Sequence, residues 1–330
     1  MTDTFAGAAI PDFLPGAKQL RTICGFWRRI LAFVIDLFLI GLFGIILGLF
    51  FSGFFERLGP WGQLLGFMIS LAYFGFFNSS KGDGQTPGKR LLQIRVVDRE
   101  GNRISPPRSL ARYAILGAPW FLDSSLPQSL QASRFGTGFE FLLSGMSVAF
   151  TYLYIFNRAT RQSLHDLIVG TYVVESASNG RVEVPVVWKG HLYIAVASVM
   201  IVLVGGPLVS TKFSQAGPFP ELFSIQRSVG QMDNVASVGV TINQQVGSAT
   251  FTTLIVTVQW NPPPRDDEKA VAQVAARVLA TDPRAASRDY LLIRRVSGYN
   301  IGIARSTKFR DFNFTPAQWQ QKIRDASTAA

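Results

Sequence analysis

The segment from residue 30 to residue 55 constrains the fold of this chain most strongly, because it is long and almost entirely apolar. It runs for 26 residues, and Asp36 is its one ionisable side chain. A helix of about 20 apolar residues is long enough to cross the hydrocarbon core of a bilayer. A carboxylate at the centre of such a helix costs roughly 2.5–3.5 kcal/mol on insertion scales. We therefore predict a membrane-spanning helix in which Asp36 faces protein or water instead of lipid.

Composition and charge are typical of a polytopic membrane protein with a soluble part attached. Hydrophobic residues make up 48% of the 330 residues, and charged residues still make up 16%. The net charge is +11. Because the basic residues cluster beside apolar segments, as the positive-inside rule predicts for cytoplasmic loops, we expect no nucleic-acid partner.

Four further apolar segments predict a total of about five transmembrane helices, which form an α-helical polytopic bundle. The segment 109–126 is the least regular of them, since it is short and contains Pro119. A re-entrant or interfacial segment is the alternative there. That alternative leaves four spans and places the C-terminal domain in the cytoplasm. The predicted spans that follow 30–55 are 61–77, 109–126, 139–156 and 192–209.

The loop after the second span predicts the orientation of the chain. Between residues 78 and 112 this loop holds more basic than acidic residues, so it resists translocation. We therefore expect it on the cytoplasmic side of a bacterial-type inner membrane. Anionic lipid headgroups are the expected partner of its basic part, 81–112. The N-terminal segment 1–23 and the connector 176–191 are then also cytoplasmic. The basic residues are Lys81, Lys89, Arg90, Arg95, Arg99, Arg103, Arg108 and Arg112, and the acidic ones are Asp83, Asp98 and Glu100.

The chain beyond the fifth span, residues 217–330, has the pattern of a soluble α+β domain. Residues rich in Val, Thr and Ile alternate with turn signals, and a helical spacing of Ala and Val separates two strand pairs. The predicted order is ββαββα with an antiparallel sheet, outside the cell membrane. The expected elements are strands 235–243 and 249–260, a helix 266–280, strands 290–296 and 300–309, and a terminal helix from residue 315.

Arg29 and Asp36 are the first candidate site residues, because both lie in or beside the first span. They are seven residues apart, so they share one helix face about 10 Å apart along the axis. That separation is too long for an ordinary ion pair. Arg29 is expected to reach the cytoplasmic interface, and Asp36 either stays protonated or receives a hydrogen bond from a neighbouring helix.

A second group of candidates follows the fourth span. Asp166 and His165 lie at the same membrane face as Arg28 and Arg29, so an ion pair between Asp166 and one of these arginines is expected to close the bundle. Asp123 and Glu140 are auxiliary carboxylates on the outer side. For these two, the competing interpretation is an interface residue that marks a helix end.

Three blocks in the first half of the chain resemble the RDD family of membrane proteins, over about residues 24–175. They are Gly25–Asp36 (GFWRRILAFVID), Thr86–Asp98 (TPGKRLLQIRVVD) and Arg161–Val174 (RQSLHDLIVGTYVV). The resemblance implies that Arg29, Asp36 and Asp166 are the arginine and two aspartates for which the family is named. The sequence departs from the family pattern at Gln93, where Gly is expected, and at Gln162-Ser163.

The resemblance implies an integral membrane domain for which transport is commonly proposed, with cation/proton exchange for some members. The first hypothesis is therefore a transporter of small cations and protons, with Asp36 as carrier and Arg29 and Asp166 at the cytoplasmic mouth. The alternative is a non-transporting anchor whose outer domain binds an envelope partner. A purely structural role for the polar set is a competing interpretation, since interhelical polar contacts contribute about 0.6 kcal/mol on average in one membrane protein.

The sequence predicts neither an enzyme nor a resident cofactor. One Cys and two distant His residues do not make a zinc site, so no metal is expected. The sequence is compatible with a homo-oligomer, and it identifies neither the substrate nor the ligand of the outer domain.

Overall fold

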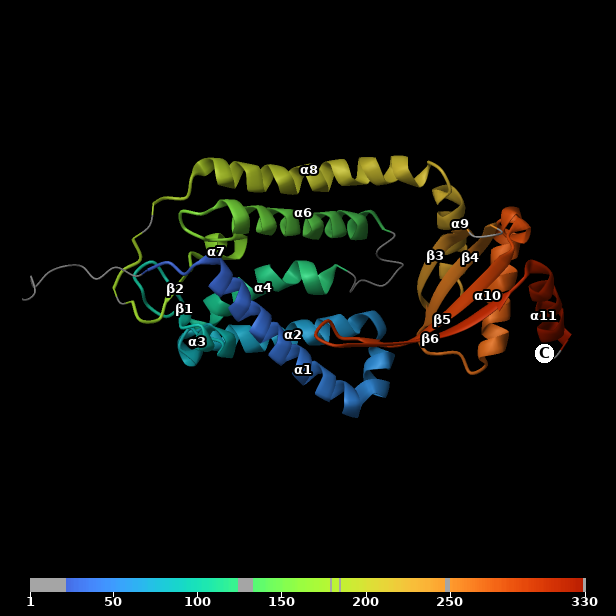
Figure 1. Cartoon of the computed structure of the whole chain (residues 1–330), viewed down its shortest axis with the longest axis horizontal. Helices are drawn as coiled ribbons and strands as arrows, with labels where there is room; N and C mark the ends of the chain where they lie inside the picture. The colour runs from blue at the N-terminus through green and yellow to red at the C-terminus, as the bar shows by residue number, and fades with distance from the viewer. Residues whose placement is uncertain (1–21, 124–132, 179, 184, 247–249, 329–330) are drawn as a thin grey trace, which may run out of the picture.

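The computed structural model describes residues 22–123, 133–178, 180–183, 185–246 and 250–328. These residues form a bundle of long helices with an α+β domain at one of its ends (Figure 1). Four of the long helices run roughly side by side, and α1 crosses them at an angle. The long helices are α1 (Phe26–Leu58), α2 (Gly62–Phe77), α4 (Pro106–Leu122), α6 (Arg134–Phe156) and α8 (Lys189–Ser214).

Three helical stretches among the described residues are long and apolar enough to cross a membrane. They are Phe26–Phe77, Arg134–Phe156 and Lys189–Ser214, and the first contains both α1 and α2, which are joined by a turn at Gly59–Trp61. Large apolar side chains are exposed along them, with Phe50 of α1 77% accessible. Such surface is stable in contact with lipid and not in water. The protein is therefore a multi-pass membrane protein.

The helix α4 occupies most of the segment 109–126 but is not among these three stretches. It has 17 residues and contains Pro119. Residues 124–126 lie outside the described residues. A total of five spans therefore stays a prediction.

A small sheet and two short helices close one end of the bundle. The strands β1 (Ile94–Val97) and β2 (Tyr172–Glu175) pair antiparallel, with Ile94 opposite Glu175. These strands are far apart in the sequence, because β2 comes after α6. The short helices are α3 (Pro87–Leu91) and α7 (Leu164–Val169).

The C-terminal domain contains one four-stranded sheet, ordered β3-β4-β5-β6. The expected antiparallel sheet is wrong at its centre, because β4 and β5 pair in parallel. The helix α10 returns the chain to the starting end of β4, so β5 runs in the same direction. The helix α9 precedes the first strand and was not expected. The elements are α9 (Phe219–Gly230), β3 (Val235–Val246), β4 (Thr250–Trp260), α10 (Asp267–Thr281), the 3-10 turn Pro283–Ser287, β5 (Tyr290–Asn300), β6 (Arg305–Phe314) and α11 (Pro316–Thr328).

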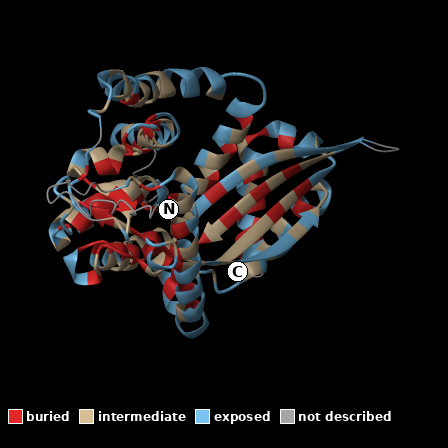
Figure 2. Ribbon diagram, turned by 60° about the vertical axis from the view of Figure 1, so that its left-hand side comes forward, coloured by how far each residue is buried: buried red, intermediate tan, exposed pale blue. Residues whose placement is uncertain are grey.

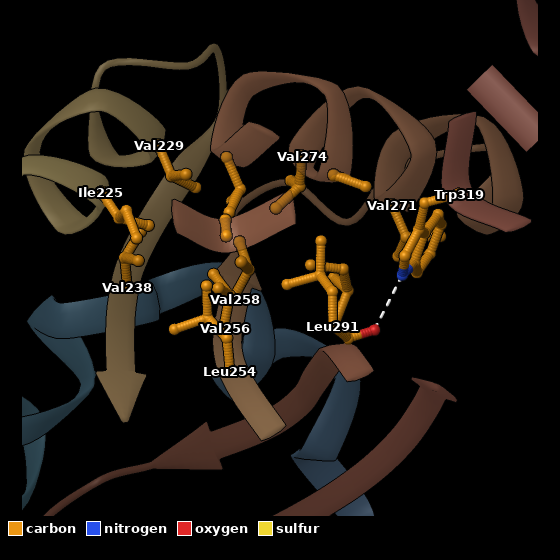
Figure 3. Packing of buried hydrophobic residues seen from close by; sticks show 14 of the residues in the cluster. Ile225, Val229, Val238, Leu254, Val256, Val258, Val271, Val274, Leu291 and Trp319 are labelled. Carbon is orange, nitrogen blue, oxygen red and sulfur yellow. Dashed lines mark hydrogen bonds between the residues drawn. The ribbon is translucent and has the colours of Figure 1, made fainter. Parts of the chain in front are cut away.

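The core of this domain lies between one face of the sheet and the helices α9, α10 and α11. Along β4 every second residue is buried, as a strand with one covered face requires (Figure 2). Val271 and Val274 of α10 pack above these positions, and the Trp319 indole of α11 donates a 2.7 Å hydrogen bond to the Leu291 carbonyl (Figure 3). The domain therefore has a hydrophobic core separate from the bundle.

The hairpin β5–β6 extends from this domain into the adjacent end of the bundle. The turn expected between the predicted strands 290–296 and 300–309 lies inside the ladder instead, where Gly298 pairs with Thr307, and the true turn follows Asn300. The tip then packs against α1 and α2. A Cβ at Gly66 of α2 would lie 1.7 Å from the Ile301 carbonyl oxygen. Glycines on both helices therefore form the surface that receives the hairpin tip.

Candidate functional site

Asp166, in α7, is the centre of a buried polar cluster. Its side chain is fully buried and accepts hydrogen bonds from three groups. Arg29 of α1 donates to Oδ2 at 2.5 Å. Arg112 of α4 donates to Oδ1 from Nε at 2.9 Å and from Nη2 at 2.7 Å, and the Thr171 hydroxyl donates to the same oxygen at 2.9 Å. The cluster therefore joins α1, α4 and α7 through one carboxylate.

Arg29 forms the ion pair with Asp166 that the sequence analysis expected, and Arg112 adds a second one. Burial opposes ionisation of the Asp166 carboxyl, but the charge of Arg112, together with that of Arg29, holds its pKa well below the usual range. The carboxylate is therefore charged at physiological pH, and it compensates two buried guanidinium groups.

His165 borders the same cluster in its neutral form. Burial lowers the pKa of His165 to about 3, although the neighbouring Asp166 opposes the shift. Its Nε2 lies 3.1 Å from Arg112 Nη2, which can only donate, so the ring proton is assigned to Nδ1. That Nδ1 is buried and has no hydrogen-bond partner among the residues that the structure describes. The cluster therefore holds a donor that protein groups do not satisfy.

Asp36 lies apart from this cluster and connects α1 to α3. Its fully buried carboxylate accepts hydrogen bonds from the Tyr73 hydroxyl at 3.0 Å, the Thr86 hydroxyl at 2.5 Å and the Gly88 amide at 2.9 Å. Thr86 is the N-cap of α3. A Cβ at Gly88 would lie 2.2 Å from the carbonyl oxygen of Ala32, so only glycine allows α3 to approach α1 this closely. Tyr73 is the donor from a neighbouring helix that Asp36 was expected to need.

A cavity of about 410 Å³ lies beside both carboxylates, between α1, α4 and α6. Arg29, Lys89 and Arg112 line it at one end, together with His165. Phe33 and Phe150 contribute to its apolar walls. The described residues that line it include no acidic side chain, and Asp166 lies behind Arg29 and Arg112, with which it is paired. The lining is therefore apolar with a basic end.

A comparison of the chain with known protein families covers the region that contains these residues. The model of the RDD family matches residues 23–170. This region is an RDD-family domain. No characterised protein and no solved structure matches the chain significantly. The C-terminal α+β domain lies outside the family match.

The remaining candidates of the RDD domain lie away from the Asp166 cluster. Arg28 pairs with Glu175 at 2.5 Å and donates to the Leu92 carbonyl at 2.6 Å. Asp123 ends α4 at the opposite end of the bundle, where it lines a separate cavity next to the hairpin tip. Glu140 lies in the first half of α6, towards the same end. The structure therefore brings Arg29, His165 and Asp166 together and leaves Asp36, Arg28, Asp123 and Glu140 elsewhere.

Lys89 and Arg112 belong to the site of the RDD domain, although the sequence presents them only as basic residues of the loop 81–112. Lys89 is 9% exposed, and within the described part of the chain its ammonium makes no hydrogen bond or ion pair. Its closest aromatic contact is the Phe74 ring, whose centroid lies 6.0 Å away. Arg112 begins the apolar stretch of α4, and a lone basic residue in that position is a signal for a buried partner.

The departures from the family pattern have a local explanation. Gln93 follows α3 with φ at +53°, a left-handed conformation that glycine adopts without steric cost. The Gln162 amide donates to the Thr171 carbonyl at 2.9 Å, and the Ser163 hydroxyl donates to the Phe150 carbonyl at 3.2 Å. Gln162 and Ser163 therefore connect α7 to β2 and to α6.

Replacing Gln93 with glycine is expected to stabilise the protein by on the order of 0.5–1 kcal/mol. The substitution removes left-handed strain, and the entropy that glycine loses on folding offsets part of the gain. The midpoint of thermal unfolding in detergent should rise. Gln231→Gly is the matched control, because Gln231 is exposed with φ at −86°, and there the midpoint should fall. A lower unfolding midpoint for Gln93→Gly would contradict the inference that the left-handed conformation strains Gln93.

Proposed function

We propose that the RDD domain moves a small ion across the membrane in a proton-coupled manner, and that the cavity between α1, α4 and α6 is its binding site. The observation that carries this proposal is the group of three basic side chains at the end of a cavity inside the bundle. Buried ionisable residues in membrane domains commonly mark ion pathways. The absence of acidic side chains from the described lining favours an anion over the cation that the family resemblance suggests.

Lys89 is the group in this cavity best suited to couple ion binding to protons. It belongs to α3, outside the spanning helices, and burial and the charge of Arg112 lower its pKa to about 7, although Asp36 opposes the shift. The ammonium therefore predominates below pH 7 and the neutral amine above it. Asp36 supports α3 next to Lys89 through the Gly88 amide, so its expected role as proton carrier becomes a competing assignment.

Chloride flux in proteoliposomes is expected to fall as the pH rises through about 7, because Lys89 loses its charge. Lys89→Met should abolish the flux at every pH. Lys89→Arg is the matched control, because it keeps a positive charge, so its flux should persist and lose the pH dependence. The competing assignment of Asp36 as the carrier is tested by measuring sodium flux in the wild type, and both sodium and chloride flux in Asp36→Asn. Wild-type chloride flux from Lys89→Met, or sodium flux that only Asp36→Asn removes, would contradict the assignment to Lys89.

The orientation that we propose puts this basic end in the cytoplasm and the C-terminal domain outside the inner membrane. The support is the concentration of basic residues around α3 and the β1–β2 sheet, as the positive-inside rule predicts. Reporter fusions at residues 100, 180 and 250 test it. A cytoplasmic reporter signal at residue 250 would reverse the assignment of the α+β domain.

The alternative function is a membrane anchor that presents the α+β domain to an envelope partner. It is favoured by the separate core of that domain and by its two edge strands, β3 and β6. Unpaired strand edges are a common way to add a partner strand. Under this alternative the wild-type protein conducts no ion, and a photo-crosslinker in place of Gln244 of β3 captures one specific envelope protein. Ion flux from the purified protein would contradict a pure anchor.

A further inference from the structure

The basic cavity adjoins a second cavity whose described lining is mostly apolar and includes no charged side chain. The second cavity has a volume of about 550 Å³ and extends along α1, α4 and α6 towards the C-terminal domain. The two cavities share lining residues, so they are direct neighbours. The shared residues are Phe33, Tyr113, Leu116, Phe150 and Thr151.

The far end of the apolar cavity is closed by the hairpin β5–β6. Gly302 and Ile303 of the hairpin tip line it, opposite Gly41 of α1. Phe26 of α1 lines the basic cavity at the other end. The distance along α1 from Phe26 to Gly41 is about 22 Å at the helical rise. One leaflet of the hydrocarbon core is about 15 Å thick, so this path is long enough for an acyl chain.

We propose that the two cavities together bind one phosphate-bearing anionic lipid, with its headgroup at Lys89 and Arg112 and one acyl chain along the apolar cavity. The headgroup occupies the basic end that the transported ion also uses, so lipid and ion compete there. The inference goes beyond the proposed transport and does not depend on it.

The basic end has groups suited to a phosphate. Lys89 contributes an ammonium that forms no ion pair with the described residues, and the Arg112 guanidinium lines the same end of the cavity. Phosphate oxygens accept charge-assisted hydrogen bonds from such donors. The exposed Trp27, 76% accessible, lies beside this end of α1, and Trp is enriched where headgroups meet the hydrocarbon. The donors therefore lie where a headgroup phosphate is expected.

A lipid uses both cavities, whereas a free anion can use only the basic end. Apolar side chains of α1, α4 and α6 form most of the lining of the second cavity, and they offer a small hydrated anion no compensation for lost water there. The same walls stabilise an acyl chain by close packing. Charge at one end and apolar walls along the rest are complementary to an amphiphile.

The test is binding of phosphatidylglycerol to the full-length protein in mild detergent, measured by native mass spectrometry. Phosphatidylcholine with the same acyl chains and inorganic phosphate serve as the comparison ligands. Lys89→Met removes the headgroup contact, and Thr151→Trp fills the shared wall of the two cavities. Arg90→Met is the matched control, because Arg90 is exposed on the same short helix. Thermal unfolding verifies that each variant folds.

One phosphatidylglycerol per protein is expected, with affinity about ten-fold weaker in Lys89→Met and in Thr151→Trp and unchanged in Arg90→Met. Equal weakening by Lys89→Met and Arg90→Met would reduce the effect to surface electrostatics and overturn the proposal. Equal affinity for phosphatidylcholine would overturn the headgroup assignment. If inorganic phosphate binds tightly and Thr151→Trp leaves that binding intact, the basic end is a site for free anions, and the proposal of lipid binding is overturned. Chloride flux plays no part in this readout, so failure of either proposal is recognised separately.

Discussion

Replacing Asp166 with asparagine is expected to lower the free energy of unfolding by about 3–5 kcal/mol, because it leaves two buried guanidinium groups without a compensating charge. Arg29 and Arg112 are 7% and 6% exposed, so water does not replace the lost carboxylate. The asparagine side chain keeps the size of the aspartate and can still accept one hydrogen bond. The lost free energy of unfolding therefore measures the effect of removing the charge and not that of creating a cavity.

The measurement is equilibrium unfolding in detergent with a denaturant, read as the shift of the transition midpoint. Glu175→Gln is the matched control, because Glu175 also pairs with an arginine of α1, but the two side chains are 39% and 41% exposed. An exposed pair contributes about 0–1 kcal/mol. Equal losses in the two variants would show that the Asp166 cluster does not stabilise the bundle as a buried unit.

The ion pairs of Asp166 with Arg29 and Arg112 are also expected to remain intact in mild acid. The folded pKa of Asp166 lies well below its unfolded value, so its contribution is present above the unfolded pKa. It is lost only as the pH falls through the folded pKa. The difference in midpoint between wild type and Asp166→Asn should therefore stay constant between pH 7 and pH 5.

Replacing Gly66 with leucine is expected to release the hairpin β5–β6 from the bundle. Even a Cβ at Gly66 would lie 1.7 Å from the Ile301 carbonyl oxygen and 3.3 Å from the Phe121 ring. The obstacle is backbone, so the hairpin tip has to move away. Release also exposes Ile301, which is fully buried in the wild type.

Thiol labelling of an Ile301→Cys variant in a Cys24→Ala background measures this release. Labelling should accelerate at least ten-fold when Gly66→Leu is added, which corresponds to about 1.4 kcal/mol of docking free energy. Gly53→Leu in α1 is the matched control, because nothing lies within 4 Å of a Cβ there. Unchanged labelling in Gly66→Leu would mean that the tip does not need this glycine to dock.

The polar residues of the RDD domain were predictable where sequence motifs identified them, and not where the fold alone brings them together. Arg29 and Asp166 were paired from their positions at the same ends of two predicted spans. The position of Arg112 signals a buried partner, but Asp166 is that partner only because α4 packs against α7, which the sequence does not indicate. Lys89 was hidden in a basic loop, since its burial depends on Gly88 allowing α3 against α1.

In the C-terminal domain the predicted strands 235–243 and 249–260 lie close to β3 and β4, whereas the predicted strand 300–309 is displaced from β6 and the connections differ. The buried alternation of β4 is a local pattern. The parallel pairing of β4 and β5 depends on where α10 returns the chain. Gly298 was interpreted as a turn signal, but it lies where a Cβ would come 2.1 Å from the Ser306 carbonyl oxygen of the facing strand. Glycine occurs both where two strands approach each other closely and where the chain turns, and the sequence alone does not distinguish the two settings.

The docked hairpin also has a consequence for the order in which the protein is built. Residues 299–304 pack against α1 and α2, but the ribosome makes them after every long helix of the bundle is already synthesised. Until then the glycine surface of α1 and α2 has only lipid to cover it. Final maturation of the membrane part therefore waits for the last strands of the chain, and a nascent protein truncated before residue 290 inserts with that surface vacant.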